Sequence, residues 1–221
     1  MALSSSIAAG SVMRPAAQLY PAAKRALDVL VAASLLLVLL PLLALIAVAI
    51  VWDGGGPILY RGDRVGHNGR PFRVLKFRSM RAGCDQTAHV AFVRSLMREG
   101  STCAVYKVPD DRRVTQVGQF LRRTSLDEIP QLWNVLRGEM TLVGPRPDVP
   151  YALDDYSDWM HRRLAVKPGI TGLWQVSGRS QLSLLDMYRL DVAYVEGASL
   201  LLDLSLLLRT VPVVLGRDGA A

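Results

Sequence analysis

Residues Val29–Trp52 read VLVAASLLLVLLPLLALIAVAIVW and contain no charged side chain. A run of roughly 24 residues is long enough to cross the hydrocarbon core of a bilayer as a helix. Pro41 lies in its middle, where a proline removes a helical hydrogen bond and bends the axis. We therefore expect a re-entrant membrane helix over 29–52, which enters the bilayer, bends and leaves on the same side.

Basic residues flank this run on both sides. Lys24 and Arg25 precede it. A second group follows it, formed by Arg61, Arg64, Arg70, Arg73, Lys76 and Arg78. The positive-inside rule assigns both ends to the cytoplasm, which a re-entrant helix satisfies and a straight span does not. The alternatives are a straight transmembrane helix and a secretory signal cleaved at Ala47–Ala49, although the run is long for a signal sequence.

Composition narrows the partners. The chain has 221 residues, a formal net charge of +7 and 51% hydrophobic residues, with a pI near 9.8 and a mean hydropathy of +0.24. The charge favours an anionic partner such as nucleic acid, anionic lipid or a nucleotide sugar. The hydrophobic content favours membrane lipid among these. We expect no nucleic acid, because the basic residues are scattered and form no zinc-finger, RRM or helix-turn-helix pattern.

The chain divides into three parts around this anchor. Residues 1–21 are small, polar and aperiodic, and predict a flexible leader. Residues 22–216 form the membrane-anchored domain, and residues 217–221 form a tail. Cys84 and Cys103 have no metal-binding spacing and are interpreted as reduced cytoplasmic thiols.

Local patterns within the domain predict an α+β, mostly helical fold. Asn68-Gly69 predicts a hairpin turn between short strands at Ile58–Tyr60 and Arg73–Phe77. A further amphipathic helix is expected around Phe92, Leu96 and Met97. Leu200–Leu215 is apolar apart from two charges, contains a proline and is typical of an interfacial helix.

The most chemically informative stretch is RRTSLDEIPQ, residues 122–131, in which Asp127 and Glu128 are adjacent. Two carboxylates among cations can hold a divalent metal and offer an oxygen nucleophile. The competing interpretation is structural, since Ser125 to Glu128 spells a capping box. Pro130 is tolerated only in a first helical turn, so the helix could instead begin near Asp127. Ile129, Leu132, Trp133 and Leu136 would give it an apolar face.

Two further loops carry candidate phosphate-binding arginines. Arg146 lies between two prolines that restrict its backbone, which suits bidentate phosphate binding, although an exposed turn arginine explains the same pattern. Arg179 ends a glycine-punctuated loop that matches neither a P-loop nor a Rossmann fingerprint. In that loop Trp174 could stack on a base, but burial in the core is the more common role. The histidines lie in separate segments without a nucleophile elbow, so a serine hydrolase is not indicated.

Several long motifs occur in an order that resembles the bacterial sugar transferase family, the monotopic polyprenyl-phosphate phosphoglycosyl transferases. They are KRALD at 24–28, the proline-broken apolar helix, KFRSM at 76–80, TSLDEIPQLWNV at 124–135, VGPRP at 143–147 and PGITGLWQVSGR at 168–179. The resemblance runs from about residue 22 to about residue 216 and is closest to the short, exopolysaccharide-initiating members. One departure is Leu40-Pro41, where relatives often have Ser-Pro.

The resemblance implies an enzyme and assigns roles to residues. Asp127 would be the nucleophile that forms an aspartyl phosphosugar with a UDP-sugar, galactose or glucose, releasing UMP. Glu128, with Asp127, would hold Mg²⁺. The phosphate-binding residues would be Arg122, Arg146, Arg179, Lys76 and Arg78, and Asp191 would support the site. The phosphosugar would then pass to undecaprenyl phosphate at the cytoplasmic face of the bacterial inner membrane.

Two other functions stay open at this level. One is a basic membrane-binding scaffold in which the acidic pair only caps a helix, and the other is a metal-dependent phosphohydrolase that uses the same acids. The identity of the sugar also stays open. So does the oligomeric state, for which a homo-oligomer is one alternative.

Overall fold

The computed structural model describes residues 15–54, 56–81, 90–91, 94–95 and 113–216. Among these the helices are α1 (Pro15–Val38), α2 (Leu40–Gly54), α4 (Gln116–Arg123), α5 (Gln131–Arg137), α6 (Asp158–His161), α7 (Leu184–Gly197) and α8 (Leu200–Gly216). The strands are β1 (Leu59–Val65), β2 (Pro71–Phe77), β3 (Thr141–Val143) and β4 (Gly169–Thr171). Short 3-10 turns connect them: η1 (His67–Gly69), η2 (Leu126–Glu128), η3 (Pro150–Asp155), η4 (Arg162–Ala165), η5 (Trp174–Val176) and η6 (Arg179–Gln181). The prediction of a mostly helical fold with a small sheet is confirmed.

Some predicted boundaries differ from the structure or fall outside it. Helix α1 begins at Pro15 and contains Pro21, so it starts inside the segment predicted as a leader, of which Met1–Arg14 lies outside the described residues. The same holds for the tail 217–221, for both cysteines, and for Phe92, Leu96 and Met97, around which a helix was expected.

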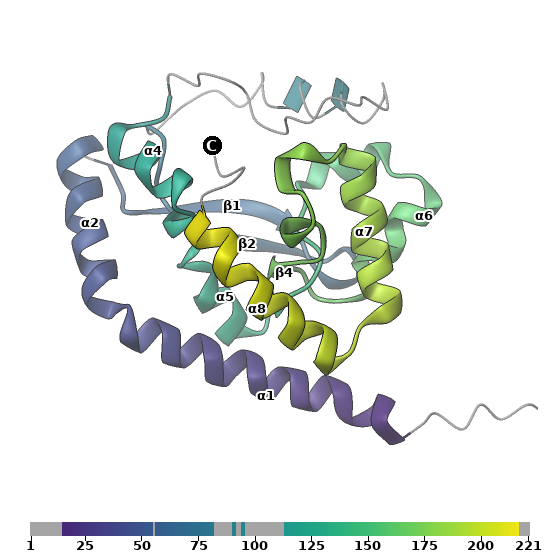
Figure 1. Cartoon of the computed structure of the whole chain (residues 1–221). Coiled ribbons are helices and arrows are strands. Elements are labelled where there is room, and N and C mark those ends of the chain that lie inside the picture. Colours follow the sequence, from purple (N-terminus) through teal and green to yellow (C-terminus); the bar gives the residue numbers. More distant parts are fainter. Residues whose placement is uncertain (1–14, 55, 82–89, 92–93, 96–112, 217–221) are drawn as a thin grey trace, which may run out of the picture.

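The apolar run forms two helices rather than one. Helices α1 and α2 meet at Leu39 with a bend of 62°, so that in Figure 1 α1 runs along the bottom of the molecule and α2 turns up its left-hand side. Pro41 explains the break, because its ring cannot donate a backbone hydrogen bond and clashes with the preceding turn. No single described helix is long and apolar enough to cross a membrane, whereas the bent pair from Tyr20 to Gly54 satisfies length and composition.

Helix α1 is attached to the rest of the chain by polar side chains in its middle. Asp28, which is 5% exposed, accepts from the Thr141 hydroxyl at 2.6 Å and from the Leu142 amide at 3.0 Å. Lys24 donates to Asp203 of α8 at 2.8 Å and to the Val143 carbonyl at 3.0 Å. The motif that precedes the apolar run therefore docks this helix onto β3 and α8.

Arg25 completes this attachment at the end of α5. It donates to the carbonyls of Val135 and Leu136 at 2.6 and 2.8 Å. These carbonyls belong to the last turn of α5, which ends at Gly138 in the left-handed conformation with φ 77°. The Val135 carbonyl also accepts from the Gly138 N–H, and Arg25 adds a cation at the negative end of the helix.

The hairpin of β1 and β2 packs against α5 through β2. The strands pair in antiparallel register from Leu59 opposite Phe77 to Val65 opposite Pro71, and Asn68 adopts φ 54° in the turn. The hairpin that Asn68-Gly69 predicted is confirmed, with longer strands. Asn134 of α5 covers the free edge of β2, because its amide accepts from the Leu75 N–H and donates to the Arg73 carbonyl.

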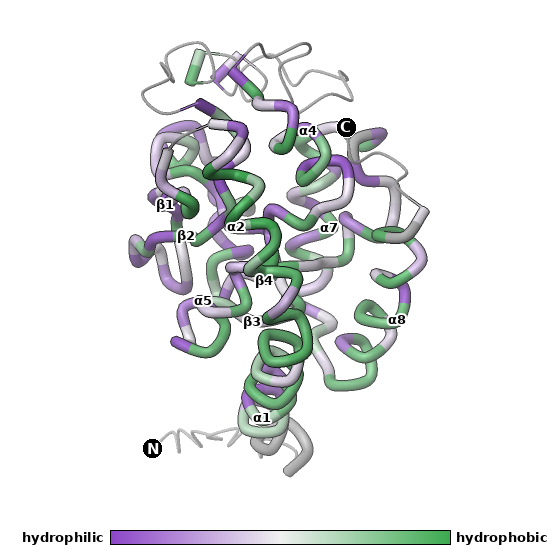
Figure 2. Tube along the Cα trace, turned by 90° about the vertical axis from the view of Figure 1, so that its left-hand side faces the viewer, coloured by the Kyte–Doolittle hydropathy of each residue, from purple (hydrophilic) through white to green (hydrophobic). Residues whose placement is uncertain are grey.

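Apolar packing joins these elements into one core. Its buried members come from α1, β2, α5, β3, α7 and α8: Ala32, Val74, Leu132, Val135, Met140, Leu142, Val143, Tyr194 and Leu206. A second cluster joins α2 to β2 and α4 through Ile46, Ile50, Phe77 and Leu121. Trp133 does not share the buried face of α5 that its spacing predicted, since it is 53% exposed. Figure 2 shows that hydrophobic residues are frequent along α1, α2 and α8.

Strands β3 and β4 form a short parallel pair at which two glycines meet. A Cβ atom added to Gly169 would lie 2.1 Å from the Gly144 nitrogen, closer than any real contact. Gly197, at the exposed end of α7, has no neighbour closer than 4.0 Å to such an atom.

We expect Gly169→Ala to lower the free energy of unfolding by about 1–3 kcal/mol, because the strands must separate to admit the methyl group. Gly197→Ala is the matched control and should change it by less than about 1 kcal/mol. Thermal unfolding of both variants in detergent checks this. Equal stability of the two variants would contradict the close approach.

Candidate active site

The acidic pair lies in a 3-10 turn, not in the first turn of an α-helix. Ser125 adopts the left-handed conformation with φ 57° and ψ 15°, and Leu126–Glu128 form η2 immediately after it. Helix α5 follows, beginning at Gln131 after Pro130. The Ser125 side chain makes no capping hydrogen bond, so the capping-box interpretation is wrong. A left-handed serine is strained relative to glycine, and such strain often accompanies functional residues.

Glu128 binds two cations from other segments. Arg146 contacts both of its oxygens, with Nη2 at 2.5 Å from Oε1 and Nη1 at 3.2 Å from Oε2. Lys76, on β2, donates to Oε1 at 2.7 Å. Burial opposes ionisation of Glu128, but the charges and hydrogen bonds of Arg146 and Lys76 outweigh it and hold its pKa well below the usual value. Glu128 is therefore an anion that fixes the positions of two cations.

Asp127 is in a different state although it is the next residue. It is 8% exposed, and among the described residues no side chain donates a hydrogen bond to its carboxylate. Burial raises its pKa, while the charge of Lys76 acts in the opposite direction. Arg122 lies close enough to lower it further and is itself held by the Ser79 hydroxyl at 3.1 Å. The result is a buried carboxylate with unused lone pairs beside several cations.

A cavity of about 100 Å³ lies next to this pair. Four cations, two acids and two aromatic side chains are in its wall: Arg64, Lys76, Arg146, Arg163, Asp148, Asp191, Trp174 and Tyr188. Asp127 and Glu128 themselves are not lining residues. Lys76 and Arg146 face the cavity and also bind Glu128, so the acidic pair and the cavity share these two cations.

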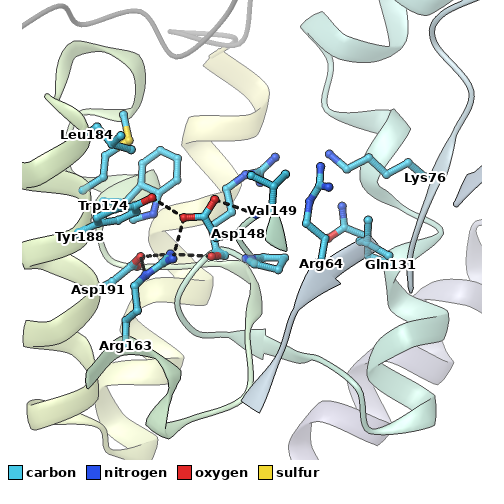
Figure 3. Close-up of a pocket in the computed structure, with 14 residues that line it drawn as sticks. Arg64, Lys76, Gln131, Asp148, Val149, Arg163, Trp174, Leu184, Tyr188 and Asp191 are labelled. Carbon is cyan, nitrogen blue, oxygen red and sulfur yellow. Dashed lines mark hydrogen bonds and ion pairs between the residues drawn. The ribbon is translucent and has the colours of Figure 1, made fainter. Parts of the chain in front are cut away.

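The far wall of the cavity contains a buried ion cluster (Figure 3). Arg163 is 3% exposed and donates to Asp191 through Nε at 3.0 Å and Nη2 at 2.6 Å. Its Nη1 donates to Asp148 at 3.2 Å. Tyr156 and Tyr188 also donate to Asp148. Because Arg163 Nη2 bonds the Arg146 carbonyl at 2.6 Å as well, the cluster fixes the backbone that carries Arg146.

In this cluster the negative charge of one carboxylate is only partly balanced by a positive charge. Two carboxylates share the single guanidinium of Arg163, and Asp191 is 1% exposed. Burial, together with the charge of Asp148, raises the pKa of Asp191 to about 6, although Arg163 opposes the rise. Asp191 thus contacts Arg163, the residue that binds the Arg146 carbonyl.

The other predicted residues lie further from the acids. Arg78 follows β2, is not a cavity-lining residue and has a buried Nε without a partner among the described residues. Arg179 adopts φ 49° at the start of η6, and its Nη1 lies 3.4 Å from the Val213 carbonyl of α8. Trp174 is partly buried, lines the cavity and is not a member of the buried apolar clusters. Lys76 and Arg146 thus contact the acidic pair through Glu128, and the charge of Arg122 lowers the pKa of Asp127. Arg78 and Arg179 do not line the cavity.

The described residues contain no group of three or more histidine, cysteine or acidic side chains that could hold a metal. Mg²⁺ does not need such a group, because it is usually held by one or two carboxylates together with substrate phosphates and water. Asp127 has free lone pairs, and Glu128 Oε2 accepts a single hydrogen bond, at 3.2 Å. The two acids therefore fit that mode of binding.

Comparison with known proteins identifies the family. Residues 19–217 match the model of the bacterial sugar transferase family, and the chain belongs to it. A UDP-galactose-lipid carrier transferase of Erwinia amylovora is 43% identical over 89% of this chain and 41% of its own length. The exopolysaccharide production protein ExoY of Sinorhizobium fredii is 42% identical over 89% of this chain and 87% of its own.

A third relative has a different sugar in its name. The UDP-glucose:undecaprenyl-phosphate glucose-1-phosphate transferase of Caulobacter vibrioides is 41% identical over 89% of this chain and 71% of its own length. The chain spans less than half the length of some relatives, such as the Erwinia protein. Galactose and glucose both occur among relatives of similar identity, so identity alone does not select the sugar.

Sequence reasoning did not identify Arg163, Asp148, Tyr188 or Gln131 as part of the site. Arg163 lies 15 residues from Asp148 and 28 from Asp191 along the chain, so no periodicity relates them. Of these four residues, Asp148 was the easiest to infer from the sequence, because it lies two residues after Arg146. Gln131 is 2% exposed and lines the cavity four residues after Asp127.

The pKa of Asp191 predicts a pH dependence of stability. Its folded pKa of about 6 lies above the ordinary value of 3.8, so between these values the folded chain binds more protons than the unfolded chain. The contribution of this carboxyl to the free energy of unfolding therefore falls as pH rises through this window, by on the order of 3 kcal/mol at most.

Asp191→Asn should remove the part of the fall in the free energy of unfolding with rising pH that comes from this carboxyl. The amide oxygen still accepts a hydrogen bond from Arg163. Thermal unfolding of both proteins from pH 4 to 7 gives the difference directly. Parallel stability curves would show that Asp191 titrates normally.

Proposed function

We propose that the chain transfers hexose 1-phosphate from a UDP-hexose to undecaprenyl phosphate, an initiating step of exopolysaccharide synthesis. The observation that carries this proposal is Asp127, a buried carboxylate without a hydrogen-bond donor among the described residues, beside cations that also face a cavity. Neither oxygen of Asp127 is among the fully enclosed polar atoms without a partner, so the carboxylate is accessible to a ligand. The names of the relatives supply the two substrates, since they include UDP-galactose, UDP-glucose, a lipid carrier and undecaprenyl phosphate.

The chemistry would proceed in two displacements. An oxygen of Asp127 attacks the β-phosphorus of the donor and forms an aspartyl phosphosugar, while the bond to the oxygen bridging both phosphates breaks and UMP leaves. A phosphate oxygen of the lipid then attacks the same phosphorus, forms the diphosphate and releases the Asp127 carboxylate. Each step exchanges one P–O bond for another, so no oxidant, reductant or added water is needed.

The surrounding residues would make attack of an anion on an anion feasible. Lys76 and Arg146 face the cavity from fixed positions, because Glu128 holds both side chains and Arg163 holds the Arg146 backbone. Fixed cations stabilise developing charge without reorganisation during the reaction. The raised pKa of Asp127 keeps this carboxylate basic enough to be a competent nucleophile once deprotonated. Asp127 and Glu128 would hold Mg²⁺, which when bound neutralises charge on the diphosphate.

We propose a membrane location at the cytoplasmic face, and the placement of the bent helix pair supports it. Lys24 and Asp28, before the bend, contact β3 and α8, and Asp53, after it, accepts from the Val117 amide of α4 at 2.8 Å. Both ends of the pair therefore return to one domain. Val38 and Leu40, on either side of the bend at Leu39, are 73% and 62% exposed. An exposed apolar bend with both ends on one side supports re-entrant insertion into the inner membrane.

The transfer proposal predicts that Asp127→Asn abolishes sugar-phosphate transfer, by at least about 10³-fold, because an amide cannot replace the nucleophile. Radiolabelled UDP-galactose and UDP-glucose, with purified enzyme and undecaprenyl phosphate, give lipid-linked product and UMP as readouts. Asp186→Asn, on an exposed face of α7, is the control and should retain activity. Full turnover by Asp127→Asn would contradict the nucleophile assignment, and UMP release independent of lipid would instead indicate a phosphohydrolase.

The re-entrant proposal predicts that both flanks of the bend lie on the cytoplasmic side. Single cysteines at Ala22 and Trp52, in a background lacking Cys84 and Cys103, should both react with an impermeant maleimide in inverted vesicles and neither in intact cells. Both positions are exposed in the structure, so lack of reaction reports the membrane side. Labelling of one site in each preparation would mean that the pair spans the bilayer.

A further inference from the structure

One carboxylate oxygen in the cavity wall has no role in the proposed phosphate transfer. Asp191 Oδ2 accepts both hydrogen bonds from Arg163, whereas Oδ1 is buried and has no hydrogen-bond partner among the described residues. A buried carboxylate oxygen without a partner costs free energy unless a ligand supplies a donor. Asp191 lines the cavity, so a ligand in the cavity can supply that donor.

A second buried polar side chain faces the same space. The Gln131 carboxamide lines the cavity, the residue is 2% exposed, and no described residue forms a hydrogen bond with it. In Figure 3, Gln131 lies with Lys76 and Arg64 on one side, while Asp191, Trp174 and Tyr188 lie on the other. The cavity is thus cationic on one side and carries an acid and aromatic rings on the other.

This division assigns different parts of a sugar nucleotide to the two sides. Phosphate oxygens only accept hydrogen bonds and are negatively charged, so they suit the cations and are repelled by Asp191. A ring hydroxyl donates and is neutral, and its ring can pack on an aromatic face.

We propose that Asp191 Oδ1 accepts a hydrogen bond from a ring hydroxyl of the donor, with Trp174 forming the adjacent wall, so that this side of the cavity selects the donor. The inference rests on the proposed transfer from a UDP-hexose and deepens it. The ring can be the hexose or the ribose, which have the same chemistry toward a carboxylate.

The test compares donors that lack one hydroxyl. A site built to hydrogen-bond a hydroxyl discriminates strongly against the analogue without it, because the buried partner is left unsatisfied. For the native chain we expect kcat/KM to fall at least about tenfold for one analogue, either a deoxyhexose or the 2′-deoxyribose form. In Asp191→Ala the same analogue should lose less than about threefold relative to its parent donor. The analogue whose loss of kcat/KM disappears in Asp191→Ala shows whether the contacted ring is the hexose or the ribose.

Two further variants keep the test decisive. Asp186→Ala removes an exposed acid of the same helix and should leave every penalty as in the native chain. If Asp191→Ala does not fold, Asp191→Asn takes its place, since it retains an acceptor for Arg163 and turns an N–H toward the cavity. With a donor that carries fluorine in place of the critical hydroxyl, kcat/KM should fall less in that variant than in the native chain. The reason is that fluorine accepts a hydrogen bond from the amide but cannot donate one to the native carboxylate.

The outcomes separate this inference from the function on which it rests. Unchanged deoxy penalties in a folded Asp191 variant, with transfer by the native chain intact, overturn the hydroxyl contact alone. Absence of transfer by the native chain from any UDP-hexose overturns both proposals.

Discussion

The ion pairs of Glu128 with Arg146 and Lys76 hold the site together. They connect three segments that are remote in sequence, the hairpin strand β2, the turn η2 and the loop after β3. Their partly buried setting makes them stronger than surface pairs, and both cations must be present to offset the burial of the acid. Asp127, the adjacent carboxylate, is left without such partners. One acid thus organises the cations, and the other remains available for chemistry.

A second ionic group stabilises the first from behind. Arg163 binds two acids, 15 and 28 residues away in sequence, and also the Arg146 carbonyl, so the position of the Arg146 guanidinium depends on this cluster. The first group, Glu128 with Lys76 and Arg146, carries an excess positive charge, and the second carries an excess negative charge. The cavity between them is therefore polarised, which suits a ligand with a phosphate at one end and hydroxyls at the other.

Much of this arrangement could be predicted from particular residues. Pro41 indicated the bend, Asn68-Gly69 the hairpin, and the order of motifs indicated that Lys76 and Arg146 lie near the acidic pair. The capping box failed because Glu128 finds two cations through tertiary contacts that no local rule contains. The left-handed Ser125, the exposed side of Trp133 and the partners of Arg163 depend on the same long-range packing. Lys24 and Arg25 suggested topology through their charge, yet the structure shows that both also bind neighbouring segments.

The central claim is that Glu128 acts by holding Arg146, and a double-mutant cycle tests it most directly. The variants Glu128→Gln, Arg146→Gln and the combination are compared by kcat/KM for sugar-phosphate transfer, with unfolding curves as a check on folding. If the pair acts as one unit, each single change is severe and the double change is no worse than about the more severe single one. Strictly additive losses would contradict the account, because they would mean that Glu128 and Arg146 contribute independently.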